Sequence, residues 1–146
     1  MTSDPLYDND FYAWTQRQAK LLEQSDDQRL DAENLAEEVA AMGRSGVRAT
    51  TGSLLRALVG LVTLAGNTDA INKGSQPCGP RHSDIREHHC QARDVYTPSM
   101  RALIDLDDIW RNAVKLANYQ RAPYGAPDVP SDLPCPFTLD DLLAPD

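Results

Sequence analysis

An all-α fold is predicted by three features of this 146-residue sequence. Apolar residues recur at spacings of three and four along most of the chain, and no segment alternates convincingly with a period of two. A glycine- and proline-rich stretch at 66–80 reads as a loop between helices, and five prolines after residue 119 favour an extended strap. Because a chain of this length suits one core, we expect residues 1–146 to form a single helical domain.

The first predicted helix covers residues 8–24, and either Asp8 or Asp10 can cap its N-terminus. Residues 25–28 are polar and connect this helix to the next one. At a period of 3.6 residues, one face of the helix gathers Phe11, Trp14, Gln18, Leu21 and Leu22.

The second predicted helix begins near Asp31, whose carboxylate can accept hydrogen bonds from the N–H groups of the first turn. Leu35, Val39 and Met42 then recur at spacings of four and three. We expect this apolar stripe to face a core. The glycines at 43 and 46 predict that the helix stops or bends there.

A third helix is predicted over residues 47–64, and it is apolar on nearly every side. Such a helix is buried by its neighbours, so we place it at the centre of the bundle. A homodimer would also suit a helix of this kind. A fourth helix is predicted over 84–95, and a fifth starts near Ser99 and reaches Ala117.

The C-terminal part is predicted to be a proline-rich strap at 122–137, followed by a short helix at 138–143. Thr138 stands at the N-cap of that helix, and Asp141 is placed to complete a capping box. The prediction is therefore a bundle of four main helices with a short terminal helix, the strap wrapping the outside.

Composition narrows the classes of protein that the chain can belong to. Its 14 basic and 22 acidic residues give a net charge of −8, which argues against an electrostatic surface for nucleic acid or anionic membrane. Three cysteines are an odd number, which favours reduced thiols and a cytoplasmic location. The longest apolar run, residues 54–65, is interrupted by Arg56 and too short to span a bilayer, so we expect no membrane association.

Four segments resemble the bacterial Domain of Unknown Function 29 family. The aromatic opening at Asp10–Trp14 and the long motif at Asp31–Ser45 match the family's first two signatures. Ile85–Glu87 and the closing Cys135–Leu143 match two more. The resemblance spans nearly the whole chain and implies a compact helical domain, but it implies no activity.

The polar residues of the long motif have no assigned role: Asp31, Glu33, Asn34, Glu37, Glu38, Arg44 and Ser45. A solvated acidic face at the start of a helix is the ordinary interpretation. A metal site is the alternative, although di-metal bundles use Glu-x-x-His motifs and this helix has no histidine. We also expect at least one of Glu33, Asn34, Glu37 and Glu38 to bond internally and brace the bundle. In a sharper form of this expectation, Asn34 or Glu38 pins the first and second helices together through Arg17, Arg44 or Ser45.

A second cluster holds all three histidines and two of the three cysteines: Cys78, His82, His88, His89 and Cys90. Thiolate and imidazole are zinc ligands, so metal binding or catalysis by this cluster is an alternative function. The spacing is poor, because no C-x-x-C pair is present and adjacent helical residues point about 100° apart. We therefore predict no metal and no cofactor, and we assign no catalytic residue.

Two rows of arginines give a third alternative, which is binding of nucleic acid. Ion pairing with the many carboxylates is the more ordinary role for these side chains. The rows are Arg44, Arg48 and Arg56, and Arg81, Arg86 and Arg93.

The leading hypothesis is a non-enzymatic cytoplasmic module for interaction or regulation, with a protein partner or a second copy of the chain.

Overall fold

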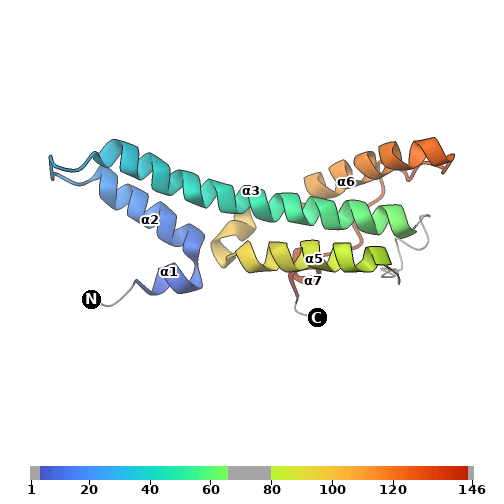
Figure 1. Cartoon of the computed structure of the whole chain (residues 1–146), viewed down its shortest axis with the longest axis horizontal. Helices are drawn as coiled ribbons and strands as arrows, with labels where there is room; N and C mark the ends of the chain where they lie inside the picture. Colours follow the sequence, from blue (N-terminus) through green and yellow to red (C-terminus); the bar gives the residue numbers. More distant parts are fainter. Residues whose placement is uncertain (1–3, 66–79, 145–146) are drawn as a thin grey trace. The chain divides into compact units, whose positions relative to one another are not determined.

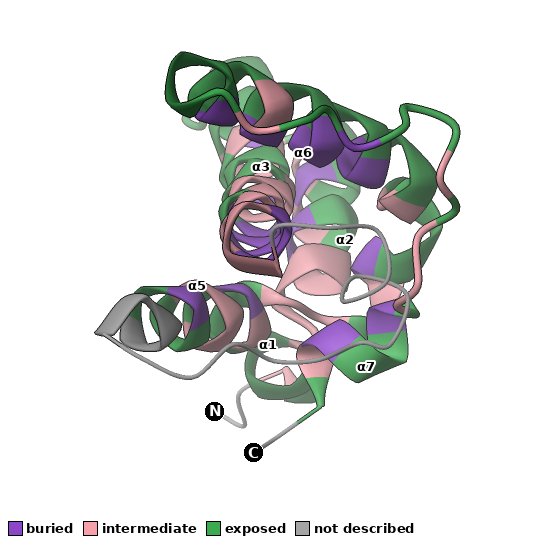
Figure 2. Cartoon of the chain, turned by 90° about the vertical axis from the view of Figure 1, so that its right-hand side faces the viewer, coloured by how far each residue is buried: buried purple, intermediate pink, exposed green. Residues whose placement is uncertain are grey.

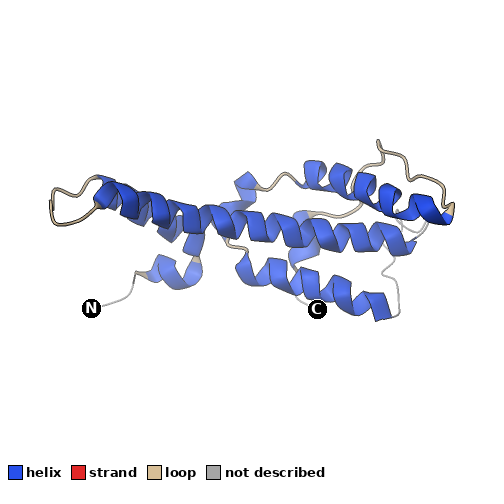
Figure 3. Cartoon of the chain, turned by 45° about the horizontal axis from the view of Figure 1, so that its top comes forward, coloured by secondary structure: helices blue, strands red, loops and turns tan. Residues whose placement is uncertain are grey.

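The computed structural model describes residues 4–65 and 80–144, with side chains from residue 84 onward in the second range. Every regular element in these ranges is helical (Figures 1 and 3), which confirms the all-α prediction. Four of the helices have 13 residues or more, as predicted. In order the elements are α1 (Pro5–Asn9), α2 (Phe11–Glu23), α3 (Ala32–Ala65), α5 (Pro80–Val95), the 3₁₀ helix η1 (Pro98–Leu103), α6 (Leu106–Arg121), the 3₁₀ turn η2 (Ala122–Tyr124) and α7 (Leu139–Leu143).

The chain divides into two compact units that alternate along the sequence. The first unit comprises Met1–Ala49 and Val95–Ile104, and the second comprises Thr50–Asp94 and Asp105–Asp146. Helix α3 contributes its N-terminal half to the first unit and its C-terminal half to the second.

Helix α3 is one element of 34 residues, so the second and third predicted helices are continuous. Of the two alternatives predicted at Gly43–Gly46, a stop or a bend, the stop is wrong. Glycine inside a helix costs only about 1 kcal/mol relative to alanine, and here neighbouring elements occupy the space that a side chain would fill. A Cβ at residue 43 would collide with the Thr15 hydroxyl and would lie 3.2 Å from the Tyr12 ring. A Cβ at residue 46 would lie 3.2 Å from the Met100 methyl group. The two glycines therefore mark close packing of α2 and η1 against α3.

The length and composition of α3 also meet the criteria for a membrane-crossing helix, with a mean hydropathy of 1.2 over 18 residues. The core helix of a globular protein meets the same criteria. In the second unit α3 has this core character, because Leu54, Ala57 and Leu58 are fully buried. The expectation that the chain does not enter a membrane stays a prediction.

The predicted first helix is two helices that meet at Asp10, the expected capping residue. The Asp10 carboxylate accepts a hydrogen bond of 3.1 Å from the Ala13 N–H and so caps α2. Tyr7 of α1 packs edge-to-face on Trp14 of α2, and Phe11 stacks on the same indole. This aromatic cluster fixes α1 against the beginning of α2.

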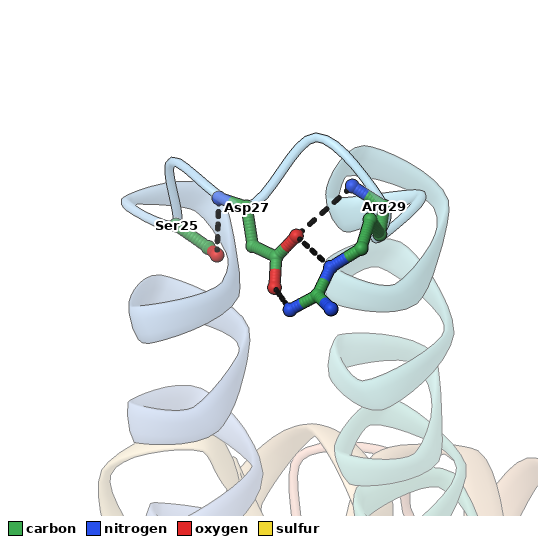
Figure 4. Close-up of polar contacts among 3 residues, drawn as sticks. All are labelled: Ser25, Asp27 and Arg29. Carbon is green, nitrogen blue, oxygen red and sulfur yellow. Dashed lines mark hydrogen bonds and ion pairs between the residues drawn. The ribbon is translucent and has the colours of Figure 1, made fainter.

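A short turn joins α2 to α3 and is closed by one carboxylate (Figure 4). Asp27 accepts two bonds from the Arg29 guanidinium, at 3.0 and 2.8 Å, and a third from the Arg29 backbone N–H. The Ser25 hydroxyl accepts a bond from the Asp27 N–H. The bonds from Arg29 lower the pKa of Asp27. The turn thus holds α2 and α3 as an antiparallel hairpin.

The core of the second unit is built on α3, as expected for a helix that is apolar on nearly every side. Figure 2 shows the buried residues on α3, α5 and α6 in purple. A Cβ at Gly60 would lie 2.8 Å from Ile85, so α5 packs directly on the backbone of α3. The core includes Leu54, Leu58, Leu61, Val62, Ile85, Ala92, Ile109, Trp110, Ala113, Val114 and Ala117.

Two predicted helix boundaries differ from the structure. Helix α5 begins at Pro80 rather than at residue 84, since proline suits the first turn of a helix. The predicted fifth helix is divided into η1 and α6, because Asp105 adopts an extended conformation and its carboxylate caps α6 by accepting from the Asp108 N–H. Except for Pro80, the predicted loop at 66–80 lies outside the described residues.

The strap is held to α6 by side chains that bond its backbone. Trp110 donates its indole N–H to the Leu133 carbonyl at 2.7 Å. The Asn118 amide donates to the Val129 carbonyl and accepts from the Val129 N–H, both at 2.9 Å. The strap is not extended throughout as predicted, because it begins with η2. These contacts satisfy backbone groups of the part that follows, which has no helix or strand before α7.

The capping box predicted for the last helix is confirmed. Thr138 donates its N–H to the Asp141 carboxylate at 2.8 Å, and its hydroxyl accepts from the Asp141 N–H at 3.1 Å. Both bonds lower the pKa of Asp141. The helix they start, α7, buries Leu139 and Leu142.

Replacing Gly43 by alanine is expected to destabilise the protein by about 1–3 kcal/mol, because the new methyl group overlaps the Thr15 hydroxyl. Gly52→Ala is the matched control in the same helix, since only the flexible end of Arg56 lies near its Cβ. That control should gain up to about 1 kcal/mol from helix propensity. Urea unfolding followed by circular dichroism measures both variants, and equal stability would contradict the close packing at residue 43.

Asn118→Ala is expected to lower the free energy of unfolding by about 2–3 kcal/mol, because it leaves both backbone groups of Val129 without their partner. Asn112→Ala on the same helix removes only an exposed bond to Asp108 and should cost less than about 0.5 kcal/mol. Thermal unfolding of the two variants measures the difference. Equal melting temperatures would mean that the strap does not depend on Asn118.

Candidate functional site

The polar residues of the motif at Asp31–Ser45 lie on the first turns of α3. The Asp31 carbonyl accepts from the Leu35 N–H at 3.0 Å, so the helix begins directly after Asp31 as predicted, but the carboxylate does not bond the N–H groups of the first turn as expected. The same carboxylate accepts a bond of 2.8 Å from the Asn34 side chain. The expected brace from Asn34 to the first helix is therefore wrong, because this amide bonds within its own helix.

The remaining polar motif residues are exposed: Glu33, Glu37, Glu38, Arg44 and Ser45. Arg44 pairs with Glu37 on the same helix, and Arg17 pairs with Asp4 instead of reaching α3. Exposed pairs of this kind contribute little to stability. Among the described residues, no group of three or more histidine, cysteine, aspartate or glutamate side chains is arranged to hold a metal ion.

The apolar stripe of the motif points away from the core, which corrects the prediction for Leu35, Val39 and Met42. Leu35 is 41% exposed and Met42 is 52% exposed, and Val39 is partly exposed. The helix instead buries Ala36 and Gly43. Because α2 approaches so closely, only small side chains fit between the two helices, and the large apolar side chains lie one residue away.

Helix α2 shows the same displacement. Thr15 and Ala19 are buried, whereas Leu21 is 51% exposed. Leu21 lies two residues beyond Ala19. At helical spacing it shares a side of α2 with Trp14 and Gln18, and each of these two comes directly before a buried residue. In both helices the exposed apolar residues are rotated in the same sense about the helix axis, relative to the buried residues of the contact. Because the two helices are antiparallel, such a rotation brings the exposed residues of both to the same side of the hairpin.

Leu21, Leu35, Val39 and Met42 therefore lie on one side of the α2–α3 pair, and we call this surface the hairpin face. The large apolar side chains that it exposes are Leu21, Leu35 and Met42. The face belongs entirely to the first unit.

The 3₁₀ helix η1 covers the end of the hairpin face that lies away from the turn at residues 24–31. Asp10 accepts from the Ser99 hydroxyl at 2.6 Å and from the Ser99 N–H at 3.0 Å. The Met100 methyl group lies against Gly46, one turn beyond Met42. Toward the turn at residues 24–31 the apolar side chains stay exposed. The face is thus closed at one end and open at the other.

Comparison with known proteins decides the family. The profile described as domain of unknown function DUF29 matches residues 6–146. The chain belongs to the DUF29 family. A similar solved structure is an α-helical protein of unknown function from Rhodospirillum rubrum ATCC 11170, with 28% sequence identity and a TM-score of 0.79 over 99% of this chain and 92% of that one. No curated protein matches.

The cysteine–histidine cluster of this DUF29 protein is only partly described. Cys78 lies outside the described residues, and so does the side chain of His82. His88 contacts the Gln91 amide, and Cys90 accepts a bond of 3.3 Å from Arg93. In the part of the chain that is described, no three histidine, cysteine, aspartate or glutamate side chains gather as metal ligands.

Several arginines of the two predicted rows contact the DUF29 chain itself. Arg44 pairs with Glu37, and Arg93 donates to the Ala144 carbonyl as well as to Cys90. The side chain of Arg81 lies outside the described residues. These contacts agree with ion pairing and structural bonding as the ordinary role of such arginines.

Lowering the pH is expected to weaken the junction of α2 and η1 at Asp10. Burial raises the pKa of Asp10, but the bonds from Ser99 and Ala13 outweigh it, so the pKa lies below its ordinary value. A carboxylate with a lowered pKa stabilises the fold above its unfolded pKa of about 3.9, and this contribution is lost as the pH falls through the folded pKa.

Asp10→Asn should therefore cost about 1–3 kcal/mol at pH 7, because an amide has one acceptor oxygen where the carboxylate uses two, so at least one bond from Ser99 or Ala13 is lost and the others lose their charge. The difference from the unmodified protein should shrink by pH 2.5. Asp8→Asn, on the exposed side of α1, is the control. Urea unfolding at the two pH values checks the expectation, and a pH-independent cost would contradict it.

Proposed function

We propose that this DUF29 protein is a non-enzymatic cytoplasmic interaction module that pairs with a second copy of itself through the hairpin face. The observation that carries the proposal is the exposure of Leu21, Leu35 and Met42, side chains that helical periodicity assigns to a core. Several large apolar side chains exposed on one side of a helix pair are typical of a site for protein association. Burying them against a partner removes a hydration cost of roughly 25 cal/mol for each Å².

A second hairpin is a partner of the right shape. Two antiparallel helices can bury only the sides that they turn toward each other, and two such hairpins stacked on their apolar faces form a four-helix bundle. The small buried residues of each hairpin then stay inside it. The larger residues of the hairpin face supply the core between the copies.

The charges at the two edges of the hairpin face complement each other across a two-fold axis along the hairpin. Arg17 lies one turn before Leu21 on the α2 edge, and Glu38 lies one turn before Met42 on the α3 edge. Such an axis places the α2 edge of one copy against the α3 edge of the other. Arg17 then meets Glu38 of the second copy, and the exposed pair of Arg17 with Asp4 offers little resistance to this exchange.

Two features support an interaction module over an enzyme. The acidic motif residues are exposed, and Asp31 and Glu37 bond side chains of their own helix. Catalytic carboxylates usually lie in a cleft, and these residues lie on an exposed helix surface. The odd number of cysteines supports the cytoplasmic location, and the two described cysteines, Cys90 and Cys135, form no disulfide.

Sedimentation equilibrium between 1 and 200 μM is expected to show a monomer–dimer equilibrium that Met42→Glu shifts toward the monomer. The dissociation constant should rise at least 100-fold, or roughly 2.7 kcal/mol, because two new carboxylates are buried in the symmetric interface. Tyr119→Glu is the control, since this side chain of α6 is 81% exposed and lies outside the face. A single monomeric species of the unmodified protein at every concentration would overturn the proposal.

A charge exchange tests the orientation of the two copies. Arg17→Glu and Glu38→Arg should each weaken the dimer, because each variant places like charges in contact, and the double variant should restore it. Equal affinity of all three variants would contradict the axis along the hairpin.

A further inference from the structure

We infer that the second unit holds a binding site for a zwitterionic ligand with an apolar side chain, of which an aliphatic α-amino acid is the simplest example. The site is a groove of about 370 Å³ between α3, α5 and α6. Ligand pockets commonly lie between helices of bundles and range from about 300 to 1,000 Å³. The volume of this groove therefore favours a ligand of metabolite size. The inference is independent of the proposed dimer, because every lining residue belongs to the second unit.

The wall of the groove is apolar. Leu55 and Val59 of α3 and Leu116 of α6 line it, together with Ile85 of α5. Leu116 is 42% exposed, and Leu55 and Val59 are only half-buried. A bound alkyl side chain would remove this apolar surface from water.

Two opposite charges stand at the groove, on different helices. Arg56 belongs to α3 and Asp84 to α5, and both side chains are exposed. No ion pair joins them within the described residues. The contact of Arg56 with a side chain there is a long bond of 3.4 Å to the Ser53 hydroxyl. A guanidinium attracts a carboxylate, and a carboxylate attracts an ammonium group, so the pair matches a zwitterion.

A polar atom without a partner also lines the groove. The Thr63 hydroxyl is buried, and among the described residues it makes no hydrogen bond. A buried hydroxyl of this kind is costly unless some group bonds it. The polar head of a ligand in the groove can supply that bond. His88 and Gln120 add further polar groups to the same wall.

The test is a ¹H–¹⁵N titration of the full chain with three matched probes: L-leucine, 4-methylpentanoate, which lacks the ammonium group, and 3-methylbutylamine, which lacks the carboxylate. Leucine should shift the amide signals of Val59, Thr63, Ile85 and Leu116 and bind at least 10-fold more tightly than either analogue. Equal binding of 4-methylpentanoate would overturn the zwitterionic assignment. Absence of shifts at these residues with up to 20 mM of every probe would overturn the site.

Two charge variants separate the roles of the two ends. Arg56→Gln should weaken the binding of leucine and of 4-methylpentanoate at least 10-fold and leave the binding of 3-methylbutylamine unchanged. Asp84→Asn should weaken the binding of leucine and of 3-methylbutylamine and leave the binding of 4-methylpentanoate unchanged. Arg111→Gln is the matched control, because this exposed arginine of α6 pairs with Asp108 away from the groove. Equal effects of Arg56→Gln and Asp84→Asn on all three probes would contradict the assignment of the charges.

Thr63→Val gives a readout that does not depend on ligand. Because the hydroxyl has no described partner, the apo variant should unfold at the same temperature as the unmodified protein or at a higher one. The variant should also bind leucine several-fold more weakly. A lower melting temperature with unchanged leucine affinity would show that the hydroxyl serves the fold and not the groove.

Discussion

Both units depend on the close approach of a neighbouring helix to a glycine of α3. In the first unit, α2 packs on Gly43 through Thr15 and Tyr12. In the second unit, α5 packs on Gly60 through Ile85. A side chain at either glycine would push the neighbour outward, because protein interiors leave little space for an added methyl group. The bare backbone at these two positions sets how near the neighbouring helices come.

The same close packing accounts for the exposed apolar surface of both candidate sites. Where small residues fill a helix contact, the larger apolar side chains next to them in the sequence lie beside the contact and not within it. Met42 precedes Gly43 and is exposed on the hairpin face, and Val59 precedes Gly60 and lines the groove. A tight contact in each unit therefore leaves an unfilled apolar surface one residue away.

The sequence predicted the helical class, the caps of α2 and α7 and the central apolar helix, because these depend on local chemistry. Asp10, Thr138 and Asp141 act where their short side chains suit a helix N-terminus. The burial of Ala36 and the exposure of Met42 were not predictable in this way, because apolar periodicity does not show which neighbour packs where. Glycine was read as a helix stop, although the signal for close packing was present in the spacing of Ala36 and Gly43. The groove was not predictable either, because three helices that are distant in the sequence line it.

The alternation of the two units along the chain has a consequence for synthesis on the ribosome. Ser99 must be translated before it can bond Asp10, 89 residues earlier, so the first unit is incomplete until the whole first segment of the second unit, Thr50–Asp94, has been made. The hairpin of α2 and α3 emerges long before η1 covers one end of the hairpin face. A nascent chain therefore carries the exposed apolar side chains of this hairpin, of which Met42 is the last, until η1 follows at Pro98–Leu103. No cut of the backbone between residues 50 and 104 separates one finished unit from the other.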